Sequence, residues 1–348
     1  MNINQKQNIL EYTIDELAKL LVSYDFKPFI AKQIYDWIYK KSVNSFDEMS
    51  NISKKAKSFL NENFYFKPFD AKIVQIDKLD ETTKFLFILE DNNLIETVLM
   101  KFDYGYSVCV TTQVGCNMGC KFCASGLLKK KRNLHTFEIV NQIYSAQKYL
   151  TNKNKDSRIT NVVVMGIGEP FDNFDNLIKF IKIINCDHGL QIGVRKITVS
   201  TCGLANKIKL WTTLMPQVGL VISLHAPNDE IRNKIMPINK AFNMEKLLEA
   251  VKYYIENTNR RITFEYIMLK DVNDSIDCAI ELAKKIKNIL CYVNLIPYNP
   301  VNEHSFQRSN NVIAFANKLS QLGVTVTIRQ EKGTQINAAC GQLRANNE

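Results

Sequence analysis

The sequence predicts an α/β fold in which parallel strands and helices alternate and curve into a partial (β/α)6-type barrel. Apolar runs of strand length alternate with longer runs of helical periodicity over most of the chain. The strand-like runs are continuously apolar, which is typical of a parallel sheet covered by helices. Polar residues cluster where these runs end, and such folds keep their active sites at the carboxyl ends of their strands.

The N-terminal part of the chain is expected to form a small helical domain, at residues 1–70. Thr13 and Glu16 form a capping-box pattern ahead of an apolar helix. Apolar residues then recur at helical spacing over residues 30–38, and residues 45–64 predict one or two further helices.

A β extension is expected next, at residues 71–108. Residues 84–89 and 94–100 predict the two strands of a hairpin, because turn-forming residues separate them. A third strand, at residues 106–112, leads into a loop rich in cysteine. The core of the protein is then expected to span residues 109–348.

The core is expected to contain roughly six strand–helix units, which suits a partial barrel. Its strands are predicted at residues 161–168, 196–203, 218–226, 261–269, 292–300 and 324–330. Its helices are predicted at residues 137–150, 176–184, 244–257 and 279–289.

The composition of the chain restricts its location and its partners. Lysine and arginine number 45 against 35 acidic residues, giving a net charge of +10. That excess suits a polyanionic partner, although a generally lysine-rich composition explains it as well. No apolar run reaches the roughly 18 residues that span a bilayer, and the polar N-terminus does not resemble a signal peptide. We therefore expect a cytoplasmic protein with no membrane partner.

Nine cysteines in such a protein do not indicate a disulfide framework. Cys109, Cys116, Cys120 and Cys123 lie within 15 residues, which favours metal or redox chemistry. The spacing C-x3-C-x2-C of the last three suits an iron–sulfur cluster with one iron left open. A zinc site would normally require a fourth ligand at motif spacing, although zinc binding and chance clustering stay open.

This C-x3-C-x2-C motif, with Phe122 before its last cysteine, resembles the radical S-adenosylmethionine (SAM) superfamily. The resemblance implies that Cys116, Cys120 and Cys123 bind a [4Fe-4S] cluster, one per chain. The open iron of that cluster would bind SAM, and one electron would cleave SAM to a 5'-deoxyadenosyl radical. In such an enzyme the cofactor carries the difficult chemistry and the protein orients it.

Nearly the whole chain resembles one family of this superfamily, the RlmN and Cfr adenine methyltransferases of large-subunit ribosomal RNA. The shared segments are VGCNMGCKFCASG, MGIGEP, SLHAPNDEIR, MPINK, YIMLKDVND, NLIPYNP and AACGQL. The resemblance implies methylation at C2 of an adenine in 23S rRNA, in the peptidyl-transferase region, and of an adenine next to the anticodon in tRNAs. SLHAPND and PYNP are closer to the C2 enzymes, and Cfr-like methylation at C8 is the alternative.

The same resemblance implies which residues contact SAM. The glycine and the carboxylate of the GEP motif would form a SAM-contacting pair, since glycine permits close backbone approach and a carboxylate accepts from the SAM ammonium. The other implied contacts come from strand ends. The residues implied are Gly168, Glu169, Ser200, Ser223, Leu224, His225 and Asn299.

The resemblance also implies an unusual mechanism that consumes two SAM molecules per turnover. Cys340 would accept a methyl group from the first SAM, and the radical from the second would take a hydrogen atom from that methyl group. The resulting carbon radical would add to the adenine, Glu96 would accept the proton, and Cys109 would release the base by forming a transient disulfide with Cys340. Gln335 and Asn337 stand where the family commonly has aspartates, which puts any role of those acids in doubt here.

The remaining expectations concern partners. The basic run at residues 129–132 is expected to contact RNA phosphates, and residues 1–70 are expected to bind RNA. A flavodoxin or ferredoxin would donate the electron, and the chain would act as a monomer. Two other classes of protein also fit the cysteine motif: a non-catalytic iron–sulfur or zinc RNA-binding module, and another radical SAM enzyme. Neither requires Cys340, Cys109 or Glu96, so these residues favour the methyltransferase.

Overall fold

The computed structural model describes residues 6–301, 303–338 and 342–343. Its centre is a ten-stranded sheet in the order β14-β13-β12-β11-β10-β9-β6-β5-β4-β3 within these residues. The antiparallel extension comprises β3 (Ala71–Ile76), β4 (Thr83–Ile88), β5 (Leu94–Phe102) and β6 (Gly105–Cys109). The parallel part continues from β6 through β9 (Ile159–Val164), β10 (Ile197–Thr201), β11 (Gly219–Ser223), β12 (Ile262–Met268), β13 (Cys291–Pro297) and β14 (Val326–Ile328).

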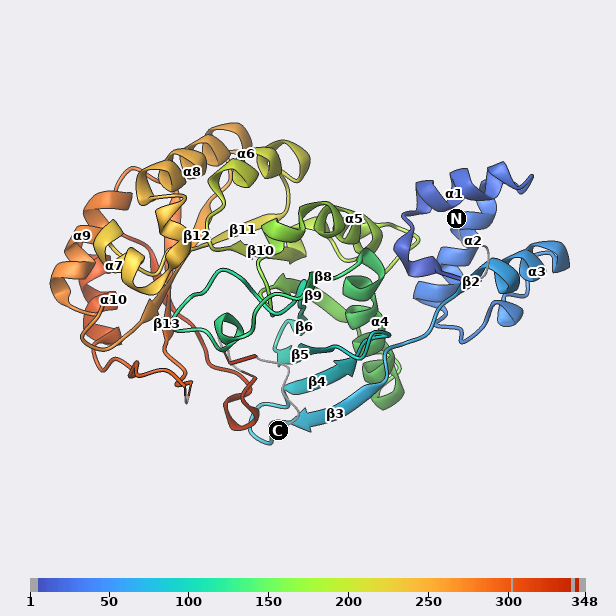
Figure 1. Cartoon of the computed structure of the whole chain (residues 1–348), viewed down its shortest axis with the longest axis horizontal. Coiled ribbons are helices and arrows are strands. Elements are labelled where there is room, and N and C mark those ends of the chain that lie inside the picture. The colour runs from blue at the N-terminus through green and yellow to red at the C-terminus, as the bar shows by residue number, and fades with distance from the viewer. Residues whose placement is uncertain (1–5, 302, 339–341, 344–348) are drawn as a thin grey trace.

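The predicted α/β fold with a partial barrel and a β extension is confirmed by this topology. The core helices are α4 (Thr136–Lys153), α5 (Phe174–Asn185), α6 (Ala205–Leu214), α7 (Asp229–Ile235), α8 (Met244–Thr258), α9 (Ile276–Ile286) and α10 (Val312–Gln321). The longer helices flank the curved sheet on its outer side (Figure 1). Helix α7 instead lies at the carboxyl ends of the strands, where its Arg232 donates to the Leu224 and Cys202 carbonyls. Three of the core helices, α6, α7 and α10, were not predicted from the sequence.

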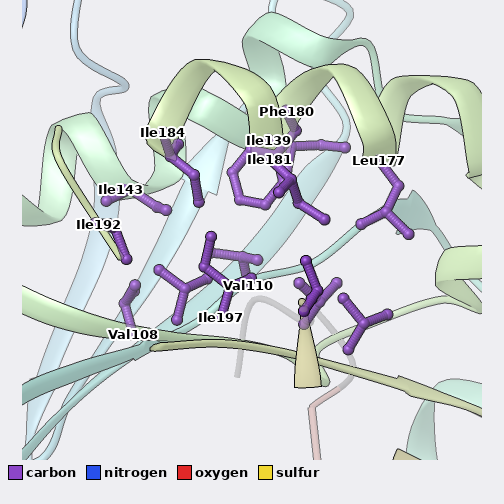
Figure 2. Close-up of a cluster of buried hydrophobic side chains, with 14 of the residues drawn as sticks. Val108, Val110, Ile139, Ile143, Leu177, Phe180, Ile181, Ile184, Ile192 and Ile197 are labelled. Carbon is purple, nitrogen blue, oxygen red and sulfur yellow. The ribbon is translucent and has the colours of Figure 1, made fainter. Parts of the chain in front are cut away.

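Helix α5 shows how the sequence directs this packing. Leu177, Ile181 and Ile184 recur at helical spacing and are all buried. Figure 2 shows their side chains pointing toward the sheet, where they meet Val108 and Ile197 of the strands. Full burial of each such side chain stabilises the fold by about 1.5–3 kcal/mol.

The N-terminal helices are α1 (Ile14–Ser23), α2 (Phe29–Tyr35) and α3 (Lys54–Asn63). The predicted capping box is present, since Thr13 and Glu16 exchange side-chain and backbone hydrogen bonds at the start of α1. The short strands β1 (Gln7–Asn8) and β2 (Phe64–Tyr65) pair in parallel and join the two ends of this helical part.

This helical part packs against α4 of the core and shares its hydrophobic cluster. The Phe137 amide donates to Glu11 Oε2 at 2.9 Å, and the Tyr144 hydroxyl donates to the Val43 carbonyl at 3.3 Å. Helices α1, α2 and α3 confirm the helical character predicted for the described part of this region. No helix in the described part of the chain is long and apolar enough to cross a membrane.

Candidate active site

A cavity lies at the carboxyl ends of the parallel strands, where the sequence predicted the active site. It is bounded on one side by the cysteine loop and on the other by strand-end residues. The lining includes Cys116, Cys120 and Cys123 from the loop, and Gly168, Glu169, Ser200, Ser223, His225 and Glu265 from the strand ends. The structure thus brings together two groups of residues that are far apart in the sequence.

The cysteine loop is closed by a short hairpin that the sequence did not reveal. Strand β7 (Gln113–Val114) pairs antiparallel with β8 (Arg132–Asn133). Between them the chain is tightly folded: an ideal Cβ on Gly115, whose φ is +77°, would lie 2.3 Å from the Lys129 carbonyl oxygen. The Cys116 amide also donates to the Leu128 carbonyl at 2.9 Å. These contacts turn the loop so that its three thiols line one cavity.

The basic run at residues 129–132 serves partly to hold this loop in place. Lys130 Nζ lies 2.6 Å from Asp172 Oδ2 at the end of the neighbouring strand loop. Arg132 pairs with Asp91 at 2.7 Å and with Glu138 at 2.6 Å. Lys131 Nζ also donates to Asn93 Oδ1 at 2.9 Å. Three of the four cationic groups are therefore engaged within the chain, and the phosphate contact expected of this run stays a prediction.

Two of the three thiols have a pKa raised by burial. Burial raises the pKa of Cys116 to about 12 and raises the pKa of Cys120 well above its ordinary value. Neutral thiols are weak ligands, so these side chains would become thiolates only when a metal supplies positive charge. Among the described residues, no three histidine, cysteine or acidic side chains converge on a site for a single metal ion. The fit to a cluster therefore rests on the shared cavity and the thiol donor set.

Gly168 and Glu169 occupy the loop that follows β9. Gly168 has a φ of +107°, and an ideal Cβ there would lie 2.6 Å from the Cβ of Gln113. The buried Glu169 carboxylate accepts from the Phe171 amide at 3.0 Å and from the Cys202 amide at 2.8 Å. Burial raises the pKa of Glu169, although these amide hydrogen bonds oppose the shift. The side chains of Thr201 and Cys202 also hydrogen-bond to this carboxylate, so its orientation at the cavity wall is fixed by several donors.

His225 is held rigidly at the cavity wall. Its backbone has a φ of 59°, and its Nδ1 accepts from the Ile267 amide at 3.0 Å. Burial lowers the pKa of this imidazole to about 3, so the ring is neutral at physiological pH. With Nδ1 accepting, the ring proton resides on Nε2. Phe122 packs edge to face against the ring at 4.9 Å, which joins the cysteine loop to the strand ends.

The other predicted SAM contacts divide between two places. Ser200 Oγ and Ser223 Oγ lie 3.3 Å apart on adjacent strand ends and line the cavity. Leu224 does not line it, because its side chain is buried in the main hydrophobic cluster. Its amide donates to the Glu265 carbonyl and its carbonyl accepts from Arg232.

A second cavity adjoins the first and contains Cys109. Met165, Ile296 and Leu343 line both cavities, so the wall between them is one side chain thick. Asn299, predicted to contact SAM, lines this second cavity. The predicted methyl acceptor, Cys340, falls outside the described residues.

Glu96 lies on the same sheet face as Cys109. Strand β5 alternates, so Glu96 and Val98 share a face, and Val98 pairs with Cys109 across the ladder. The Glu96 side chain is only 5% exposed, and its Oε1 lies 3.3 Å from Lys84 Nζ. The structure therefore places Glu96 in a buried ion pair that the sequence did not predict.

A partial parallel barrel whose strand ends face three thiols of one C-x3-C-x2-C loop defines a radical SAM enzyme. Family models agree: the ribosomal RNA large subunit methyltransferase N-terminal domain matches residues 7–66, and the radical SAM superfamily matches residues 110–286. Such enzymes use a [4Fe-4S] cluster and SAM.

The chain belongs to the RlmN family within that superfamily. A probable dual-specificity RNA methyltransferase RlmN of Malacoplasma penetrans is 56% identical, over 97% of this chain and 96% of that relative. The corresponding protein of Streptococcus gordonii is 54% identical, over 98% of this chain and 95% of its own length. The crystal structure of a radical SAM methyltransferase from Sphaerobacter thermophilus superposes with a TM-score of 0.92 at 37% identity, covering 98% of this chain and all of that one.

Replacement of Gly168 with alanine is expected to weaken SAM binding by at least about fivefold, because relief of a backbone strain of roughly 1–3 kcal/mol would shift the cavity wall. The added methyl group would also displace Gln113, which accepts from the Glu169 amide at 2.9 Å. Equilibrium dialysis of SAM against the reconstituted enzyme measures the effect.

The matched control for this substitution is Gly193→Ala. Gly193 has a φ of −55°, and the nearest atom to its ideal Cβ is a Lys196 side-chain carbon at 3.8 Å. This variant should bind SAM as the wild type does. Equal affinities for all three proteins would show that close packing at Gly168 is irrelevant to the cofactor.

Proposed function

We propose that the chain methylates C2 of an adenine in the peptidyl-transferase region of 23S rRNA, and an adenine next to the anticodon in tRNAs. As a member of its family it is a SAM-dependent RNA methyltransferase. The observation that carries the finer proposal is the pair of adjoining cavities. One holds the three thiols of the cluster motif, and the other holds Cys109 next to the chain segment that leads to Cys340.

The cofactors would occupy the first cavity. Cys116, Cys120 and Cys123 would hold the [4Fe-4S] cluster, which when bound supplies the electron that cleaves SAM. Glu169 would orient the SAM ammonium, and the neutral Nε2–H of His225 would serve as a hydrogen-bond donor. The further contacts proposed are Gly168, Ser200, Ser223, Leu224 through its main chain, and Asn299 from the neighbouring cavity.

The methyl group would travel through Cys340. Its thiolate would take a methyl group from one SAM, and the S-methyl group would then lose a hydrogen atom and bond to the adenine carbon. The flanking residues Ala338 and Leu343 line the cavity of Cys109, which supports this route. A short path between the two cavities, past Leu343, suits the transfer of a hydrogen atom from one to the other.

Glu96 and Cys109 would complete the reaction. Glu96 would accept the proton from the adduct carbon. Cys109 would then attack the sulfur of Cys340, which forms the disulfide and breaks the carbon–sulfur bond. The electron pair of that bond would stay with the carbon, which takes up a proton and leaves as the methyl group of the base. The shared sheet face of Glu96 and Cys109 supports their action on one bound base.

The partners follow from the same proposal. A target adenine in folded RNA would have to unstack from its neighbours to enter the cavity that contains Cys109. Base-modifying enzymes generally require such unstacking. Residues 1–70 would bind the RNA as an accessory domain, residues 71–108 would form an extension, and residues 109–348 would form the catalytic core. A flavodoxin or ferredoxin would supply electrons, and the chain would act as a monomer.

Mass spectrometry of the nucleosides made by the purified enzyme tests the site of methylation. We expect 2-methyladenosine from an rRNA fragment and from a tRNA with an adenine next to the anticodon. A product that co-elutes with 8-methyladenosine would instead establish the Cfr-like alternative. An unmodified RNA, from an enzyme shown to cleave SAM, would refute both.

A further inference from the structure

The turn between β3 and β4 binds the main chain of the loop that precedes Cys340. Asp80 Oδ2 accepts from the Gly333 amide at 3.0 Å, and Asp77 Oδ2 accepts from the Gln335 amide at 3.0 Å. Figure 1 shows the C-terminal loop beside this turn. Two carboxylates more than 250 residues earlier in the chain therefore each accept a hydrogen bond from an amide of this loop, at Gly333 and Gln335.

Lys84 provides a third contact to this loop and also contacts Glu96, the proposed proton acceptor. Its Nζ lies 3.4 Å from the Asn337 carbonyl oxygen and 3.3 Å from Glu96 Oε1. The side chain is only 12% exposed, so this ammonium is held between the two oxygens. Lys84 pairs with Val98 on β5, and Val98 pairs with Cys109 on β6, so all three share one face of the sheet.

The loop is shaped to fit this turn. Gly333 has a φ of +65°, and an ideal Cβ there would lie 2.7 Å from the Cβ of Ala338 and 3.0 Å from Thr82 in the turn. Burial tends to raise the pKa of Asp80, but hydrogen bonds from Thr82 and Gly333 lower it below its ordinary value. Hydrogen bonds from Thr82 and Gly333 thus favour the ionised form of this carboxylate in the folded protein.

The same segment is anchored again after Cys340. Ser125, in the cysteine loop, donates its hydroxyl hydrogen to the Leu343 carbonyl at 2.7 Å, and both residues are buried. The chain on one side of Cys340 is therefore tied to the β3–β4 turn, and the chain on the other side is tied to the cluster loop.

We infer that Asp77, Asp80 and Lys84 form a hairpin clamp, which positions residues 333–338, the segment that leads to Cys340, beside the Cys109 cavity and, through Lys84, orients the Glu96 carboxylate. These are positioning residues for the proposed reaction, and the inference rests on the roles proposed for Cys340 and Glu96. All three clamp contacts to the loop reach its main chain, which explains why Gln335 and Asn337 can lack the charge of the aspartates common in the family.

Hydrogen exchange of the loop tests the clamp without any catalysis. In the reconstituted full-length enzyme, Lys84→Met should increase amide exchange in a peptide covering residues 333–337 by about tenfold, because local opening becomes easier. Lys78→Met is the control, since Lys78 is an exposed lysine of the same turn, and it should exchange as the wild type does. Equal exchange in all three proteins would overturn the clamp.

The rates of Cys340 methylation and RNA methylation are measured on the same proteins. Each rate is divided by the amount of bound SAM, so that a smaller fraction of folded enzyme does not lower it. Lys84→Met should methylate Cys340 about tenfold more slowly and RNA about a hundredfold more slowly, because the second step also requires an oriented Glu96. Lys84→Arg should recover most of both rates, since a guanidinium can bridge the same two oxygens. Unchanged RNA methylation in Lys84→Met, or equal slowing of both steps without rescue by arginine, would overturn the positioning role.

These outcomes separate the clamp from the function on which it rests. If the wild type never carries a methyl group on Cys340, the proposed mechanism fails while the exchange comparison still decides whether the clamp exists. If the wild type is active and Lys84→Met resembles it in both measurements, the clamp fails while the proposed mechanism stands.

Discussion

Replacing Cys340 with alanine is expected to lower RNA methylation by at least about a thousandfold, the scale seen when a covalent nucleophile is deleted. The variant should nevertheless bind iron, sulfide and SAM like the wild type. The first cavity is built from the cysteine loop and the strand ends, and its described lining reaches the C-terminal segment only at Leu343. Loss of the thiol should therefore leave radical formation intact and remove only the atom that carries the methyl group.

Intact mass measurement after incubation with SAM distinguishes this result from simple loss of structure. The wild type should gain one methyl group, and Cys340→Ala should gain none. Cys186→Ala is the matched control, because Cys186 is half-buried against the main hydrophobic cluster away from both cavities. It should gain the methyl group and methylate RNA normally. RNA methylation by Cys340→Ala at a normal rate would end the two-SAM mechanism.

The fold was largely predictable because the parallel strands are buried on both faces and are therefore continuously apolar. Two of the helices that were not predicted lack a clear helical pattern in the sequence, for physical reasons. Helix α7 is seven residues long, which is too short for a periodic pattern. Helix α6 exposes Leu210 and Leu214 on its outer face, and these blur the contrast between its two sides.

The site was predictable where a motif placed a residue at the end of a strand, as for Ser200, Ser223 and His225. It was not predictable where the contact depends on distant packing. In the sequence, Arg232 cannot be distinguished from an exposed arginine on a helix. In the structure it is fully buried and donates to the Cys202 carbonyl at 2.7 Å. No local pattern distinguishes such an arginine from an exposed one, because its partners come from other strands.

The ion pairs of the cysteine loop illustrate the same limit. A run of four cations at residues 129–132 has the appearance of a phosphate-binding surface. The acids that engage Lys130 and Arg132 lie at Asp91, Glu138 and Asp172, on three different segments. Only the fold brings them together. Part of this charge run therefore stabilises the cysteine loop, and its predicted contact with RNA phosphates stays a prediction.

The Cys109→Ala variant should stop the reaction at a covalent RNA–protein adduct. Cys109 lies in the second cavity and is 9% exposed, so it is sheltered from solvent and close to the described residues that flank Cys340. Without its thiol nothing attacks the sulfur of Cys340, and the bond between that residue and the adenine persists. We expect at most one equivalent of RNA to be consumed per enzyme, and turnover to fall at least about a thousandfold.

A denaturing gel run without reducing agent measures the adduct as a shifted band that contains both RNA and protein. The double variant Cys109→Ala, Cys340→Ala should show no shifted band, because the carrier atom is gone. If proton removal precedes attack by Cys109, Glu96→Gln should also accumulate the adduct. The two substitutions would then stop successive steps of the same reaction. Free, fully methylated RNA from Cys109→Ala would mean that a group other than Cys109 resolves the intermediate. Among the described residues no other cysteine lines the second cavity, so a second thiol there could not explain that result.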